Sequence, residues 1–230
     1  MSDGHQNTTH DNELVRTRQS LQQLAEHVVA GDLWRHTSRI GLRPTPGGFG
    51  QPECVVDGVR RRIRIDGLHV VVLEGDIERW QPLSTLSGAA AFAGTSVGAP
   101  EGLYTASTVA EPDRPLDVSE QAAAQLADWF ALVGVALEEV RRRNRKLLPT
   151  IVQLWPEHFD VACSLSEVNL GGSPGDADHA EPYLYVGPWA PVQGPAWNEA
   201  WGASISWTEI GDVDQAVAYL ETGLGWALDA

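Results

Sequence analysis

Apolar residues recur every three or four positions in several segments of the chain, which is the spacing of an amphipathic helix. The strongest such pattern covers residues 118–146, where Asp117 and Glu120 stand at the start in a pattern typical of a capping box. Weaker patterns predict three further helices, over residues 13–30, 82–93 and 212–223. Gly31 and Gly223 are expected to end the first and the last of these three helices, because glycine favours the position after a helix.

Alternating apolar and polar residues predict strands between these helices. In residues 60–66, Ile63 and Ile65 alternate with Arg62 and Arg64, so we expect one buried and one charged face. The other predicted strands lie near residues 39–42, 51–56, 67–73, 150–155, 159–165, 183–187 and 202–207. Short turns join the strands of the first group, which indicates an antiparallel meander.

These elements predict an α+β fold with antiparallel sheets, a long central helix and helices packed on the sheet. We expect a disordered tail over residues 1–12 and a single domain over residues 13–230. Each half of this domain contains several strands and a helix. A diverged internal duplication, with halves 13–115 and 116–230, is therefore an open alternative.

Composition and charge limit the classes of protein to which this chain can belong. Hydrophobic residues make up 43% and charged residues 20%, as in ordinary globular domains. The net charge of −15 argues against non-specific binding to nucleic acid or to an anionic membrane surface, because both need cationic faces. A secretory signal and a membrane-spanning apolar run are both lacking in the sequence, so we expect a cytoplasmic protein. Cys54 and Cys163 are expected to be reduced, buried thiols, with a single disulfide as the alternative.

Short catalytic motifs give little support for a hydrolase. The pattern Gly-x-Ser-x-Gly occurs at residues 171–175, but Pro174 follows the serine there and has no N–H for an oxyanion hole. The second match, at residues 94–98, follows a predicted helix rather than a strand. The basic residues at 141–146 fit electrostatic capping of the long helix, with an anion or partner site as the alternative.

Polar and aromatic side chains concentrate between residues 155 and 189. Imidazole and carboxylate groups at one place can bind a metal ion or a polar ligand, and aromatic rings often line ligand pockets. The candidate ligand-binding residues are Trp155, Glu157, His158, Asp160, Asp176, Glu181, Tyr183, Tyr185 and Trp189, with Arg43 as an anion contact. A divalent metal ion would use His158, Asp160 and Glu181. The structural alternative is that the Asp, Gly, Ser and Pro residues only form turns.

Three stretches of the chain carry a resemblance to other proteins. They are Arg39-Ile-Gly-Leu-Arg-Pro-Thr-Pro-Gly-Gly-Phe-Gly50, Leu154-Trp-Pro-Glu-His-Phe-Asp160, and Ser173-Pro-Gly-Asp176 leading to Glu181-Pro-Tyr-Leu-Tyr-Val-Gly-Pro-Trp189. With these stretches, and with Leu126-Ala-Asp-Trp-Phe-Ala-Leu132, the chain resembles an uncharacterised family of proteins from high-GC bacteria. It resembles more loosely another bacterial domain of unknown function. Neither resemblance implies an activity, so no catalytic residues follow from it.

Two hypotheses about function follow from the sequence. The first is a small-molecule-binding or metal-binding protein, with enzymatic activity left open, that uses residues 155–189. The second is a non-catalytic interaction module, whose partner can be a second copy of the chain. This hypothesis rests on tryptophan and arginine, which are frequent at protein interfaces.

Overall fold

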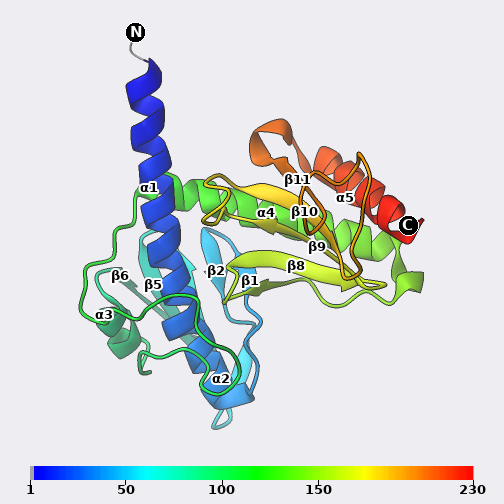
Figure 1. Ribbon diagram of the computed structural model, residues 1–230. Helices are drawn as coiled ribbons and strands as arrows, with labels where there is room; N and C mark the ends of the chain where they lie inside the picture. The colour runs from blue at the N-terminus through cyan, green and yellow to red at the C-terminus, as the bar shows by residue number, and fades with distance from the viewer. Residues whose placement is uncertain (1–2, 230) are drawn as a thin grey trace. The chain divides into compact units, whose positions relative to one another are not determined.

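The structure, a computed structural model, describes residues 3–229, and for side chains residues 13–229. It confirms the α+β fold, with two antiparallel sheets and the long helix α4 (Glu120–Arg143) (Figure 1). The chain divides into two compact units. Unit 1 contains residues 3–128 and 154–159, and unit 2 contains residues 129–153 and 160–229 of the described chain. Among the described residues, no helix is long and apolar enough to cross a membrane.

Unit 1 contains a meander of short strands in the order β1-β2-β4-β5-β6, and β3 also pairs with β4. Its strands are β1 (Arg43–Thr45), β2 (Gly48–Gly50), β3 (Cys54–Val56), β4 (Val59–Asp66), β5 (His69–Glu74) and β6 (Ile77–Pro82). The expected meander is confirmed for β3, β4 and β5. The strand expected near residues 39–42 is wrong, because only Leu42 forms a bridge there, and β1 and β2 follow where no strand was expected. Strand β6 was not expected, because no element was assigned to residues 77–81. Pro82 was assigned to the first turn of a helix, whereas it ends this strand and pairs with His69.

The helices of unit 1 begin and end at other residues than expected. They are α1 (Asp3–Leu24), the π-helix η1 (Ala25–Ala30), α2 (Gly31–Thr37) and α3 (Leu86–Phe92). Helix α1 begins at Asp3, within residues assigned to a disordered tail, and Met1 and Ser2 lie outside the described residues. Gly31 does not end the helix. A Cβ at this position would lie 2.1 Å from the carbonyl oxygen of Gly98, so Gly31 allows a close approach of two backbones.

Unit 2 contains strands in the order β11-β10-β9-β8, all antiparallel. They are β8 (Asp160–Leu165), β9 (Val168–Ser173), β10 (Tyr183–Pro188) and β11 (Ala203–Ser206). Strand β7 (Gln153–Trp155) lies where the two units meet along the chain, and Leu154 forms a bridge with Leu42 inside unit 1. The short 3₁₀-helices η2 (Arg145–Leu147) and η3 (Trp207–Glu209) and the helix α5 (Val213–Leu228) complete the unit.

Helices cover one face of the unit 2 sheet. Residue Gly172 of β9 faces Val133 of α4, because a Cβ at Gly172 would lie 2.4 Å from the Val133 Cγ2 atom. Residue Val186 of β10 faces Gly223 of α5, which lies beside β10 in Figure 1. The register pairs Val186 with Leu170, two residues before Gly172, so both helices contact the same face of the sheet. The opposite face carries Tyr183 and Tyr185.

Helix α5 offers a matched pair of glycine substitutions with opposite expected signs. A Cβ at Gly223 would lie 2.6 Å from the Val186 Cγ2 atom, so Gly223→Ala should lower the free energy of unfolding by about 1–3 kcal/mol through overpacking. A Cβ at Gly225 meets nothing within 4 Å, so Gly225→Ala should raise the free energy of unfolding by about 0.5–1 kcal/mol, because alanine favours a helix more than glycine does. Urea unfolding of the two variants measures both effects, and a stabilising Gly223→Ala would contradict this packing. Gly223 was expected to end the helix, but α5 continues to Leu228.

Candidate functional site

The predicted ligand-binding residues fall into both units. Unit 1 holds Arg43, Trp155, Glu157 and His158. Unit 2 holds Asp160, Asp176, Glu181, Tyr183, Tyr185 and Trp189.

Tyr185 and Asp160 contact each other on the face of the unit 2 sheet that is opposite to helices α4 and α5. Tyr185 stands opposite Gly171 of the neighbouring strand, and a Cβ at Gly171 would lie 2.5 Å from the tyrosine ring. The ring thus occupies the space that a side chain of β9 would fill, and its hydroxyl donates a hydrogen bond to Asp160 Oδ2. Burial, followed by the charge of Asp160, holds the pKa of Tyr185 well above its usual value, so this phenol stays protonated as a donor.

Tyr183 and Asp176 form a second pair at the start of β10. The Tyr183 hydroxyl donates to Asp176 Oδ2 at 2.6 Å, while Asp176 Oδ1 accepts the backbone N–H groups of Asp178 and His179, each at 2.8 Å. Burial raises the pKa of Asp176, but these hydrogen bonds outweigh it and the net shift is downward. The carboxylate is therefore held both ionised and fixed in position.

His179 connects this pair to the loop that precedes β11. Its Nε2 atom lies 3.0 Å from Oε1 of Glu199, and the Ser204 hydroxyl donates to the same oxygen at 2.7 Å. On the other side, Nδ1 of His179 lies 3.9 Å from Oδ1 of Asp176. The imidazole thus stands between two carboxylates from different parts of the chain.

Four aromatic rings pack together at this place. The ring of Tyr183 lies 4.9 Å from His179, 6.3 Å from Tyr185 and 6.4 Å from Trp201, between ring centroids. Trp201 meets Tyr185 edge to face at 6.0 Å. We call this group the tyrosine cluster and define it as Asp160, Asp176, His179, Tyr183, Tyr185, Glu199, Trp201 and Ser204.

Two predicted residues of unit 2 lie outside the tyrosine cluster. Glu181 is exposed, and Trp189 is 63% exposed, with its indole N–H donating to Asn169 at 3.0 Å. The metal site proposed for His158, Asp160 and Glu181 gains no support. Within the described part of the chain, no group of three or more His, Cys, Asp or Glu side chains could hold a metal ion.

Glu199, Trp201 and Ser204 were missed from the sequence as site residues. Glu199 is 20 residues from His179, beyond a long Pro- and Gly-containing loop that gives no periodic signal. The pairing of β10 with β11 brings this loop back, because Val186 pairs with Ala203. A predicted hairpin of these two strands would have been the one sequence signal for it.

In unit 1, Glu157 belongs to a separate polar group around the π-helix. The fully buried Glu26 of η1 accepts the backbone N–H groups of Ser107 at 3.0 Å and of Thr108 at 2.8 Å, and both hydroxyls as well. The backbone oxygen of Glu157 accepts the Ser107 hydroxyl. A π-turn places consecutive side chains differently from an α-turn, and here all six residues of η1 are buried.

Three side chains of this group have buried polar atoms without a hydrogen-bond partner in the described part of the chain. They are Glu157, at Oε2, Tyr104, at its hydroxyl, and His27 of η1, at Nδ1. Burial and the charge of Glu26 raise the pKa of Glu157, and burial and both carboxylates raise the pKa of Tyr104. Of the other predicted residues, Trp155 is half-buried, His158 is exposed, and Arg43 is exposed at the edge strand β1.

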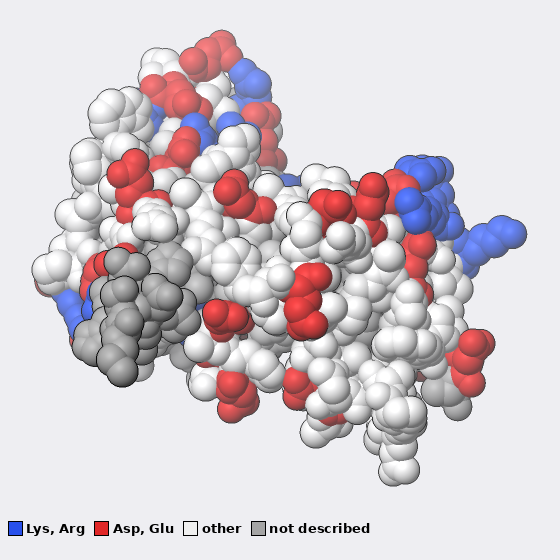
Figure 2. All heavy atoms as spheres, turned by 90° about the horizontal axis from the view of Figure 1, so that it is seen from above, with Lys and Arg blue, Asp and Glu red and all other residues white. Residues whose placement is uncertain are grey.

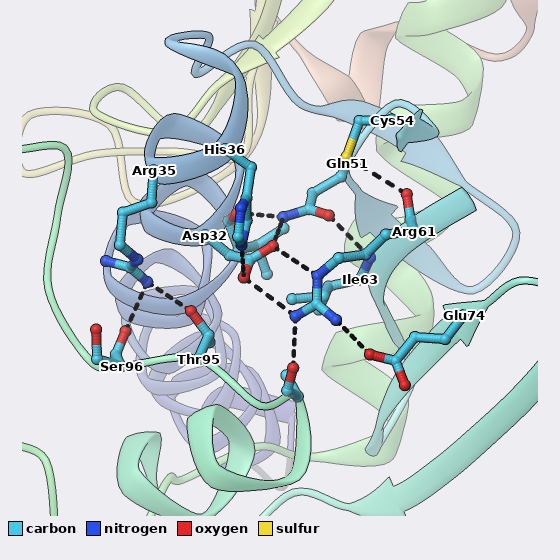
Figure 3. A network of polar contacts seen from close by, with 12 residues as sticks. Asp32, Arg35, His36, Gln51, Cys54, Arg61, Ile63, Glu74, Thr95 and Ser96 are labelled. Atoms are coloured by element: carbon cyan, nitrogen blue, oxygen red, sulfur yellow. Dashed lines mark hydrogen bonds and ion pairs between the residues drawn. The ribbon is translucent and has the colours of Figure 1, made fainter. Parts of the chain in front are cut away.

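A buried ion pair, also missed from the sequence, joins the helices of unit 1 to its sheet (Figure 3). Asp32 of α2 is fully buried and accepts hydrogen bonds from Arg61 of β4, at 3.1 Å and 3.3 Å, and from the Gln51 amide, at 2.8 Å. Arg61 also bonds Glu74 and the backbone oxygen of Ala93. Since the Asp32 carboxylate and the Arg61 guanidinium are both bonded to protein partners, this network is suited to holding the fold together.

Neither thiol is activated as a nucleophile. Burial raises the pKa of Cys163 to about 12. Burial, with the charge of Asp32, also raises the pKa of Cys54. Both cysteines are free, as expected, but of the two only Cys163 is buried, and Cys54 is half-buried. A raised pKa keeps both in the unreactive thiol form.

Comparison of the chain with protein-family models, with curated proteins and with solved structures finds no match.

Proposed function

We propose that unit 2 binds a small organic molecule at the tyrosine cluster. The observation that carries this proposal is the gathering of aromatic rings and carboxylates on one face of a sheet, with part of the group exposed. Trp201 is 42% exposed, and the side chains of Asp176 and His179 are 44% and 35% exposed. A few convergent polar groups beside aromatic surface are the usual makeup of a ligand site.

The sheet supports this proposal because it fixes the cluster in place. Helices α4 and α5 pack on the apolar face and hold the strands in position. The hydroxyls of Tyr183 and Tyr185 each donate a hydrogen bond to a carboxylate. Side chains locked by packing and hydrogen bonds lose little entropy when a ligand binds. The site is therefore expected to be largely formed before the ligand arrives.

Truncation of Trp201 tests this proposal. In saturation-transfer NMR with a mixture of neutral, anionic and cationic aromatic fragments, the full chain should transfer signal to at least one fragment. Trp201→Ala should weaken that binding at least tenfold, since loss of a central aromatic contact typically costs about 2 kcal/mol or more. Titration of the fragment against each variant gives the ratio of dissociation constants.

Trp189→Ala is the matched control, because Trp189 is an exposed tryptophan of the same unit that lies outside the cluster. It should leave binding unchanged. If Trp201→Ala binds every fragment as tightly as the unaltered chain, or if no fragment binds in a saturable way, the proposed function is wrong.

A further inference from the structure

We infer that the molecule bound at the tyrosine cluster is an organic ammonium ion with an apolar body; this inference rests on the proposed function. Its first support is the distribution of charge along the chain. Residues 147–230 contain twelve Asp and Glu residues and no Lys or Arg, so they account for −12 of the net charge of −15. All sixteen basic residues precede Leu147.

The surface shows where the basic residues nearest to this segment lie. Figure 2 shows a group of Lys and Arg over the C-terminal end of α4, Asp and Glu scattered over the same face, and further Lys and Arg mixed with acidic residues in the other part of the view. Three of those arginines form ion pairs with glutamates of unit 2: Arg141 with Glu138, Arg142 with Glu139, and Arg143 with Glu139 and Glu221. The segment that carries the cluster thus has an unbalanced negative charge, which attracts cations and repels anions.

Within the cluster, Glu199 provides the acceptor for an ammonium group. The hydrogen bonds to Glu199 from described side chains, those of His179 and Ser204, both end at Oε1. A carboxylate has about four lone-pair positions, so Oε2 can accept an N–H from a ligand. The side chain is 21% exposed and already fixed by two partners, so it can meet a ligand without large rearrangement.

The aromatic rings define where the rest of the ligand lies. Their centroids are 6.0–6.4 Å apart, which is the distance of rings in contact with one another, so no cation fits between them. The exposed part of Trp201, two residues after Glu199, is the surface left for an apolar body. A cation near an indole face is also attracted by the ring quadrupole, best of all for tryptophan. The ligand would therefore lay its body on Trp201 and direct its ammonium group to Glu199.

Three probes of similar size and different charge test the inference on the unaltered full chain. They are 2-phenylethylamine, which is an ammonium ion at pH 7, the neutral 2-phenylethanol, and the anionic 3-phenylpropionate. Titration calorimetry or NMR should show that the amine binds at least about tenfold more tightly than the alcohol, because its hydrogen bond to a carboxylate is charge-assisted. The anion should bind most weakly, and added salt should weaken binding of the amine.

A pair of charge-neutralising variants locates the effect. Glu199→Gln should reduce the affinity for the amine about tenfold and leave that for the alcohol unchanged. Glu181→Gln removes the same charge from an exposed residue of the same unit outside the cluster, so it should change neither affinity by more than about twofold. Thermal melting of each variant confirms that it is folded. The ratio of the amine and alcohol affinities is measured on the unaltered chain, so that part of the test does not depend on any variant being folded.

The outcomes separate the two proposals. If the alcohol or the propionate binds as tightly as the amine and Trp201→Ala abolishes that binding, the ammonium inference is overturned and the proposed function stands. If Glu199→Gln and Glu181→Gln weaken the amine equally, general charge attraction replaces a site at Glu199, and the inference is again overturned. If none of the three probes nor any fragment binds in a manner that depends on Trp201, both proposals are wrong.

Discussion

Asp32→Asn is expected to lower the free energy of unfolding by about 3–5 kcal/mol, the largest stability loss we predict. The substitution keeps the size of the side chain but removes the charge that faces Arg61, and both residues are buried, at 0% and 7% exposure. Arg61 cannot lose its proton at accessible pH, so its buried charge would keep only the half-exposed Glu74, at 2.6 Å, as a carboxylate partner among the described residues. Guanidinium unfolding of the variant and of the unaltered chain at pH 7 measures the difference.

The same pair predicts how stability depends on pH. Burial raises the pKa of Asp32, but the hydrogen bonds from Arg61 and Gln51 outweigh burial, and the net pKa lies below the usual value. A carboxyl whose folded pKa is depressed contributes stability above its unfolded pKa, and this contribution is lost as the pH falls through the folded pKa. The advantage of the unaltered chain over Asp32→Asn should therefore be full at pH 7 and decrease only below about pH 4.

An exposed ion pair of the same unit is the control. Arg114 and Glu111 lie 2.7 Å apart, and both side chains are substantially exposed. Glu111→Gln should therefore cost less than about 1 kcal/mol. A cost below about 1 kcal/mol for Asp32→Asn would show that water or a rearranged Arg61 replaces the missing charge, and would contradict the buried network.

Long periodic elements were predictable from sequence, because one residue type dominates each face. The helix expected over residues 118–146 is α4, Glu120–Arg143, and its expected apolar residues, such as Leu126 and Phe130, are buried. Strand β9 was missed because Gly171 and Gly172 look like turn residues. In the folded chain the ring of Tyr185 covers the first glycine, and Val133 packs against the second. A neighbouring strand and a helix thus supply the side chains that β9 lacks.

The site was predictable only where its residues follow one another closely. Asp176 and Tyr183 are seven residues apart and were both expected to bind a ligand, whereas Glu199 comes from a distant loop. Arg61 did give a signal, because alternation places it on the same face of β4 as the buried Ile63 and Ile65. A charge on an apolar face requires a buried partner, but no sequence pattern identifies Asp32, 29 residues away on a helix.

Glu26→Gln is expected to lower the free energy of unfolding by about 2–3 kcal/mol and to loosen the loop between α3 and α4. The carboxylate uses one oxygen for the backbone N–H of Ser107 and the other for that of Thr108. Glutamine has one acceptor oxygen only, so its NH₂ group would face one of these two N–H donors. A buried donor left without an acceptor costs about 1–3 kcal/mol, and the hydroxyls bound to the same oxygens lose a charged partner as well.

Chymotrypsin cleavage after Tyr104 measures the effect in the loop itself. Cleavage requires several residues to leave the surface, so its rate reports how often the loop opens. Glu26→Gln should raise this rate about tenfold or more, in line with the loss of a hydrogen bond to a charged group.

Glu101→Gln is the matched control, because Glu101 lies in the same loop and is exposed. It should leave both the cleavage rate and the unfolding free energy nearly unchanged. Equal cleavage of the Glu26 and Glu101 variants would mean that other contacts hold the loop. The six buried residues of the π-helix η1 would then act through packing, and the carboxylate of Glu26 would not be the anchor that its four hydrogen bonds indicate.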